Sequence, residues 1–199
     1  MKQKQAKIQS QAGFTLIELL AVLAIMTLIM GALAIDFASQ RTKRNIVLAK
    51  NETVTNLRKA QSYTLSSRDI SAGVPAKYYV VNFTTNSTSY TIDSIDNNYS
   101  YHSAVETINL PTNIKVSSIQ SNGSTYTCMQ IVFSAPFGKI YAYGSSTCGS
   151  AIATVLRDPI QTSALSEASS KIYFTDLSGV GPGSPYVEVV PITGQMATY

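Results

Sequence analysis

The stretch GFTLIELL (residues 13–20) decides how the N-terminal part of this chain folds. It opens a segment of 22 residues, 14–35, in which Glu18 is the only charged side chain. As a helix, this segment is about 33 Å long, enough to cross the hydrocarbon core of a membrane. A carboxylate inside such a segment costs on the order of a few kcal/mol near the bilayer centre. Glu18 is therefore a candidate functional residue that needs a partner.

The residues before this segment suggest the partner. Residues 1–13 contain three lysines and end at Gly13. A cut between Gly13 and Phe14 creates an α-amino group one helical turn from Glu18, and the carboxylate of one subunit then meets the amine of its neighbour. This pattern resembles the signal sequence of type IV pilins and pseudopilins, in which a lysine-bearing leader ends in glycine and Phe-Thr-Leu-Ile-Glu follows. The match covers only the first 35 or so residues.

The resemblance implies a structural subunit of a type IV pilus or of a type II secretion-like filament. A prepilin peptidase is expected to cut after Gly13 and to N-methylate Phe14, and Glu18 is expected to act in assembly. The other implied partners are further pilin or pseudopilin subunits in a helical homo- or hetero-filament, the inner-membrane assembly platform, and the lipid bilayer before assembly. The precursor is expected in the cytoplasmic membrane as a single-pass protein, and the assembled filament outside the cell or in its envelope.

Three other readings of the N-terminus compete with this one. Ala32-Leu33-Ala34 provides an Ala-x-Ala cleavage site for an ordinary secretory signal peptide. The apolar part of such a peptide is about 7–15 residues long, however, and has no place for Glu18. A plain membrane anchor leaves the cost of Glu18 unexplained, and a buried core helix fits neither the leader charges nor the length of the segment. The pilin reading is favoured.

The helix is predicted to continue past the apolar segment. Residues 37–65 contain neither proline nor glycine, and Val47, Val54, Leu57 and Gln61 fall at heptad-like steps. Ile46, Ala49 and Ala60 widen this apolar stripe. We therefore expect one helix from about Thr15 to about Leu65, with a transmembrane half and an amphipathic half.

The remaining residues predict a β-rich head, because short strand-like runs alternate with turn residues. The candidate strands are Lys77–Thr84, Ser89–Ser94, Asn113–Ser118, Tyr126–Phe133, Lys139–Tyr143, Ile152–Arg157, Lys171–Thr175 and Tyr186–Pro191. The expected class is α+β, a long N-terminal helix packed on an antiparallel β-rich head. The expected divisions are a leader (1–13), a transmembrane and assembly helix (14–35), its amphipathic continuation (36–66) and the head (67–199).

Cys128 and Cys148 are the only cysteines, an even number in a chain expected to be exported. A disulfide between them closes a loop of about 20 residues, for which chain entropy predicts about 3 kcal/mol of stabilisation. Two independent buried thiols are the alternative. The turn at residues 135–138 predicts a hairpin with the two cysteines near its open end.

DNA binding is the alternative function, that of a minor pilin in a DNA-uptake pilus. Arg41, Lys43 and Arg44 form a basic cluster, but they follow the apolar segment closely, where lipid headgroups or neighbouring subunits are the more plausible partners. Three of the 15 basic residues lie in the leader, so 12 remain against 11 acidic residues. Residues 194–199 carry no basic side chain, unlike a DNA-binding tail. DNA is therefore not the favoured partner.

No pattern predicts catalysis, a cofactor or a metal. His102 is the lone histidine, and neither a nucleophile motif nor a phosphate-binding loop is present. Asp93, Asp96, Asn97 and Asn98 offer oxygen ligands without the spacing of a calcium loop, so we interpret them as a solvated turn.

Within the pilin family, two regions resemble the H-type pseudopilins and minor pilins, the GspH/FimT-like group. One is the helix stretch Leu57-Arg58-Lys59-Ala60, and the other is the closing strand and glycine turn of residues 186–194.

Overall fold

The computed structural model describes residues 15–66, 69–71, 74–136, 138–157, 169–177, 185–191 and 193–199. Within the first helix, the side chains of residues 33–36, 38 and 39 are not described. The predicted leader and the predicted cleavage site between Gly13 and Phe14 lie outside the described residues. The chain divides into two units, residues 1–40 and 41–199.

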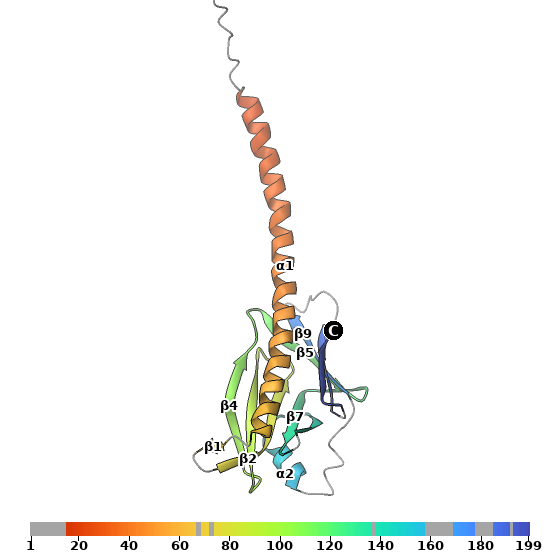
Figure 1. The fold of residues 1–199 in the computed structure, drawn as a ribbon. Coiled ribbons are helices and arrows are strands. Elements are labelled where there is room, and N and C mark those ends of the chain that lie inside the picture. The colour runs from red at the N-terminus through yellow and green to blue at the C-terminus, as the bar shows by residue number, and fades with distance from the viewer. Residues whose placement is uncertain are drawn as a thin grey trace, which may run out of the picture. The chain divides into compact units, whose positions relative to one another are not determined.

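A single long helix opens the described structure, as predicted. Helix α1 spans Leu16–Leu65 and contains 50 residues (Figure 1). Its length follows from the absence of proline and from the single glycine, Gly31, over this range. Among the residues that the structure describes, no helix is both long and apolar enough to cross a membrane.

The part of α1 that belongs to the second unit buries one stripe of side chains. Ile46, Ala49, Leu57 and Ala60 are each at most 2% exposed. Thr53 and Thr64 extend the stripe, and their hydroxyls donate to the carbonyl oxygens of Ala49 and Ala60, four residues earlier. The buried positions are thus separated by three or four residues, as on one face of a helix.

The predicted stripe is wrong at Val47, which is 51% exposed. Val47 lies at the edge of the buried face of the helix. The preceding residue, Ile46, occupies the core instead. Since one residue rotates a helix by about 100°, a shift of one position moves a side chain from the core to solvent.

The head contains two antiparallel sheets. In the first, which has six strands, β2 is central and β1 pairs with its start. The strand order is β4 (Tyr101–Asn109), β3 (Ser89–Asp96), β2 (Val74–Thr84), β7 (Cys128–Ser134) and β8 (Lys139–Ser145), with β1 (Asp69–Ser71) beside β2. In the second, which has five strands, the order is β11 (Gln195–Thr198), β10 (Tyr186–Val190), β9 (Ser170–Asp176), β5 (Ile114–Ser121) and β6 (Ser124–Tyr126).

One hydrophobic core joins the buried stripe of α1 to both sheets. Leu57 and Ala60 of α1 share it with Phe83 and Phe133 from the first sheet and with Phe174 from the second. In the second sheet, buried and partly exposed residues alternate along β9 and β10, so one face of this sheet is open to solvent. The predicted α+β class is confirmed.

A short helix covers the other face of the first sheet. Helix α2 spans Ala151–Arg157, and its Ile152 and Leu156 pack in a second core with Val80 of β2 and Val132 of β7. This second layer explains why six successive residues of β7, from Cys128 to Phe133, are buried. The strand predicted for Ile152–Arg157 is therefore wrong.

Four strands were not predicted, namely the two three-residue strands β1 and β6 and the longer strands β4 and β11. Strand β4 lies at the edge of the first sheet, and most of its side chains are exposed or partly exposed. Strand β11 follows the turn at Gly194, whose φ of 66° lies in the left-handed region. The strand predicted as the last one, β10, is consequently followed by another, and β11 forms the edge of the second sheet.

Two lysines of α1 form hydrogen bonds with the edge regions of the two sheets. Lys59 Nζ donates to Glu106 Oε1 of β4 over 2.6 Å, and this hydrogen bond raises the pKa of Lys59. Lys50 Nζ donates to the main-chain oxygen of Tyr199 over 2.6 Å, while partial burial lowers the pKa of Lys50. Both lysines therefore connect the helix to edge regions of the sheets.

We expect Leu57→Ala to lower the free energy of unfolding of the head by about 2–5 kcal/mol, because it leaves a cavity in the core shared by α1 and both sheets. Urea unfolding of the full chain in detergent, followed by circular dichroism, measures this. Val47→Ala is the matched control and should change stability by less than about 0.5 kcal/mol, since Val47 is half exposed. A larger effect of the Val47 change would contradict the assigned helix face.

Candidate functional site

Glu18 closes a capping box at the start of α1. Thr15 precedes the first helical residue, Leu16, and Glu18 is the third residue of the helix. The Thr15 backbone N–H donates to Glu18 Oε2 over 2.9 Å, and the Thr15 hydroxyl donates to the same oxygen over 2.8 Å. The Glu18 backbone N–H donates in turn to the Thr15 hydroxyl over 3.4 Å. These contacts satisfy amide groups that the first turn of a helix leaves without partners.

The capping role of Thr15 was not predicted. The sequence nevertheless carries the signal. Threonine followed three residues later by glutamate, before an apolar run, is the sequence pattern of a capping box. The same carboxylate also benefits from its place in the first turn, because the N-terminal end of a helix favours negative charge.

The capping contacts use one of the two carboxylate oxygens. Both hydrogen bonds from Thr15 end on Oε2. In the part of the chain that the structure describes, no hydrogen bond reaches Oε1, and the side chain is exposed. A carboxylate can accept about four hydrogen bonds, so Glu18 retains the capacity to bind a further donor while it caps its own helix.

An exposed apolar surface surrounds Glu18. Eleven large apolar side chains between residues 16 and 30 are each 50–77% exposed, and among them Leu16 and Ile17 flank the capping box. They lie on all sides of the helix. A helix that is apolar all round is normally buried in a protein core or a membrane, and an exposed apolar surface of this extent marks an interaction site.

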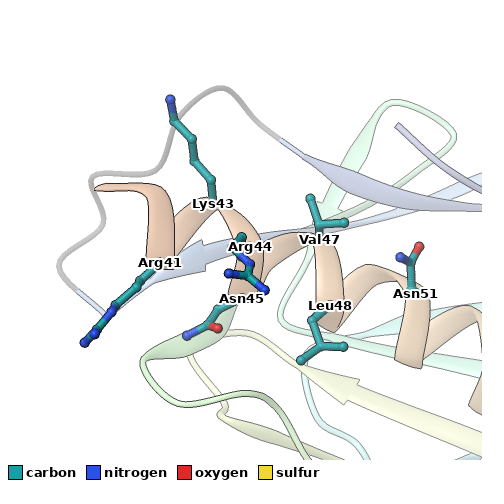
Figure 2. A pocket seen from close by; sticks show the side chains of 7 residues that line it. All are labelled: Arg41, Lys43, Arg44, Asn45, Val47, Leu48 and Asn51. Carbon is teal, nitrogen blue, oxygen red and sulfur yellow. The ribbon is translucent and has the colours of Figure 1, made fainter. Parts of the chain in front are cut away.

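A basic groove lies further along α1, within the second unit. Its basic lining consists of Arg41, Lys43 and Arg44, and Val47 and Leu48 contribute apolar surface (Figure 2). Two asparagines, Asn45 and Asn51, are the other lining residues among those described, and the cavity volume is about 580 Å³. The sequence-predicted basic cluster thus forms one wall of a groove.

Four basic residues of the head, which together could offer a surface to DNA, lie apart from one another. Lys115 lies on β5 opposite Thr175, whereas Lys171 lies four residues away from Thr175 along β9. Lys139 begins β8 in the other sheet, and Arg157 ends α2. These four side chains therefore do not form a single basic surface.

The candidate oxygen ligands around residue 96 bind protein groups. Asp93 is buried and accepts hydrogen bonds from the Asn82 amide, the Tyr101 hydroxyl and the Ala104 backbone N–H. The backbone N–H groups of Asn98 and Ser100 each donate to Asp96 Oδ1 over 2.8 Å. The hydrogen bond from Ser100 is the main cause that lowers the pKa of Asp96. Asp96 therefore closes the turn between β3 and β4, whereas Asp93 links β3 to its neighbours β2 and β4.

Cys128 and Cys148 form a disulfide, with their Cα atoms 5.3 Å apart. Cys128 is the first residue of β7, and Cys148 lies three residues before α2. The bond holds the segment before α2 against the start of β7, at the open end of the hairpin of β7 and β8.

Comparison with known proteins gives one positive result. Residues 8–34 match the prokaryotic N-terminal methylation motif, which is the signal of type IV pilins. The match includes Gly13, Phe14 and Glu18, and it confirms the resemblance stated for the N-terminus. Neither a curated protein nor a solved structure matches the chain.

We expect Thr15→Ala to weaken the first turn of α1 by about 1 kcal/mol, because the Glu18 backbone N–H loses the Thr15 hydroxyl that caps it. Hydrogen exchange of the full chain in detergent micelles should show roughly fivefold faster exchange at the amide of residue 18. Thr15→Ser keeps the hydroxyl and should exchange like the unchanged chain. Equal rates in all three proteins would rule out the capping box.

Proposed function

We propose that this chain, which carries the prokaryotic N-terminal methylation motif of type IV pilins, is a structural subunit of a type IV pilus or a type II secretion-like filament. The observation that carries the proposal is the exposed, all-round apolar surface of residues 16–30 with Glu18 at its start. A surface of this kind has no use in an isolated subunit, because exposing it to water is unfavourable by about 25 cal/mol per Å². Packing against the same segment of other subunits removes it from water.

Glu18 supplies the specificity that apolar packing lacks. In a bundle of apolar helices, neighbours can slide past one another at little cost, whereas a buried charge must meet its partner. Cleavage after Gly13 gives each subunit an α-amino group at Phe14. We infer that this amine binds Glu18 of a neighbouring subunit at Oε1, while Thr15 continues to occupy Oε2. Each pairing offsets the desolvation of both charges and fixes the axial register of two subunits.

The precursor is proposed to reside in the cytoplasmic membrane through residues 14–35. At both ends, this segment extends beyond the residues whose side chains the structure describes. Prepilin peptidase is the processing enzyme, and the inner-membrane assembly platform is the proposed site of transfer from bilayer to filament. A hydrocarbon environment covers the apolar surface before assembly, and neighbouring subunits cover it afterwards.

The head is proposed to have a structural role rather than an enzymatic one. Its disulfide and its two cores produce a rigid body on the outside of a helix bundle. Membership of the GspH/FimT-like group stays a prediction from the residues at 57–60 and 186–194.

Mass spectrometry of the protein isolated from its host should show a chain that begins at N-methylated Phe14. We expect this N-terminus because prepilin peptidase both cuts after Gly13 and methylates the new amine. A mature chain that begins at Ile35 would overturn the proposal and support secretion by an ordinary signal peptide.

Glu18→Ala should leave cleavage after Gly13 largely intact but prevent incorporation into filaments, because the amine of Phe14 then has no partner in the bundle. Sheared filament fractions, probed by immunoblot beside whole-cell samples, separate processing from assembly. Glu52→Ala is the matched control, since Glu52 lies on the same helix in the second unit and should assemble normally. Normal assembly of the Glu18 variant would contradict the charge-pairing role.

A further inference from the structure

The basic groove of α1 carries positive charge that the head does not use. Arg41 and Arg44 are three residues apart and lie on one face of the helix, whereas the side chain of Lys43, which also lines the groove, points away from Arg41 (Figure 2). All three side chains are exposed. Within the described residues, neither of the two ion pairs includes any of them, since these pairs join Lys59 to Glu106 and His102 to Asp96. The groove therefore concentrates three cations to which the described residues offer no ion-pair partner.

The lining also favours an anionic partner over water. No acidic residue is present among the described lining residues. Val47 and Leu48 are 51% and 48% exposed and form an apolar patch next to the cations. Apolar side chains exclude water, and this strengthens the attraction between the cations and a bound anion. The groove thus combines positive charge with partial exclusion of solvent.

The groove has a fixed position on the head. Asn45, between the basic residues and Val47, donates from its side-chain amide to the carbonyl oxygen of Thr112 over 3.1 Å. Ile46 beside it is buried in the core. These contacts attach the lining turn of α1 to the start of β5, so the three cations stand on a rigid element.

We propose that this groove binds the phosphate group of an anionic phospholipid, phosphatidylglycerol being the simplest example. The inference rests on the proposed function, because that function places the preceding residues in a bilayer. Arg41 comes six residues after Ile35, about 9 Å along the helix, so its side chain can reach back to the headgroup layer. A free phosphate ion shares the charge but lacks an apolar part that can contact Val47 and Leu48 of the groove.

The test uses the full chain in neutral detergent, titrated with short-chain phosphatidylglycerol or phosphatidylcholine and followed by native mass spectrometry. We expect phosphatidylglycerol to bind at least about tenfold more tightly than phosphatidylcholine, because each basic residue near an anionic headgroup contributes roughly a fivefold gain. Added salt should weaken the binding of phosphatidylglycerol and leave that of phosphatidylcholine unchanged. Equal binding of the two lipids would overturn the proposal.

Two triple variants locate the effect. The groove variant R41Q/K43Q/R44Q should lose the preference for phosphatidylglycerol. The control variant R58Q/K139Q/R157Q removes the same charge from exposed residues outside the groove and should keep the preference. Circular dichroism checks that both variants fold. If both triple variants lose the preference, or if neither variant loses it, the result would contradict binding in the groove.

Two competitors distinguish the sources of phosphate. Inorganic phosphate and a single-stranded oligonucleotide are each added to the complex with phosphatidylglycerol. If neither competitor displaces phosphatidylglycerol, the result supports a lipid site. Displacement by inorganic phosphate at the lipid's own concentration, or tighter groove-dependent binding of the oligonucleotide, would overturn the lipid assignment.

The outcome is separable from that of the proposed function. The lipid preference is measured on the uncut chain and needs neither processing nor assembly. If Phe14 is not the mature N-terminus but the groove variant still loses the preference, the filament proposal is wrong and the lipid site stands. If filaments form through Glu18 but the lipid preference is missing, only the lipid site is wrong.

Discussion

One buried stripe on α1, from Ile46 to Thr64, is the contact on which the head depends. The stripe belongs to the core that both sheets share, so neither sheet completes its hydrophobic face without the helix. Small residues, Ala49 and Ala60, lie in this stripe and permit close approach of the strands. The same helix presents eleven exposed apolar side chains before residue 31. The second half of α1 buries its apolar stripe within the subunit, whereas the first half leaves its apolar side chains exposed.

The sequence predicts the long helix and most strands because their periodicities are strong and local. It fails where a tertiary layer overrides local preference. Ile152 and Val155 favour a strand by propensity, yet Ile152, Val155 and Leu156 are spaced for one helical face and α2 buries them against Val80 and Val132. Strand β4 was not predicted because an edge strand exposes most of its side chains and therefore lacks a hydrophobic pattern.

The candidate site was predictable in its chemistry but not in its geometry. Glu18 is conspicuous in the sequence because a lone carboxylate in an apolar segment is costly. The structure adds that the two carboxylate oxygens differ. Oε2 accepts both hydrogen bonds from Thr15, whereas no hydrogen bond among the described residues reaches Oε1. This difference matters for the proposed pairing of Glu18 with the Phe14 amine of a neighbouring subunit. A carboxylate used only between subunits would have no partner before assembly, whereas the capping box already gives Glu18 two hydrogen bonds within a single chain.

If both proposals hold, the two charged features of α1 have opposite consequences for assembly. Pairing at Glu18 favours the filament, since the amine that it needs belongs to another subunit. Binding of lipid phosphate at Arg41, Lys43 and Arg44 favours the membrane, because the phosphate stays behind when the subunit leaves. A subunit therefore moves from bilayer to filament only when charge pairing at Glu18 and packing of the apolar surface together outweigh the attraction between the groove and lipid phosphate. The number of cations in the groove would then set how readily an unassembled subunit leaves the membrane.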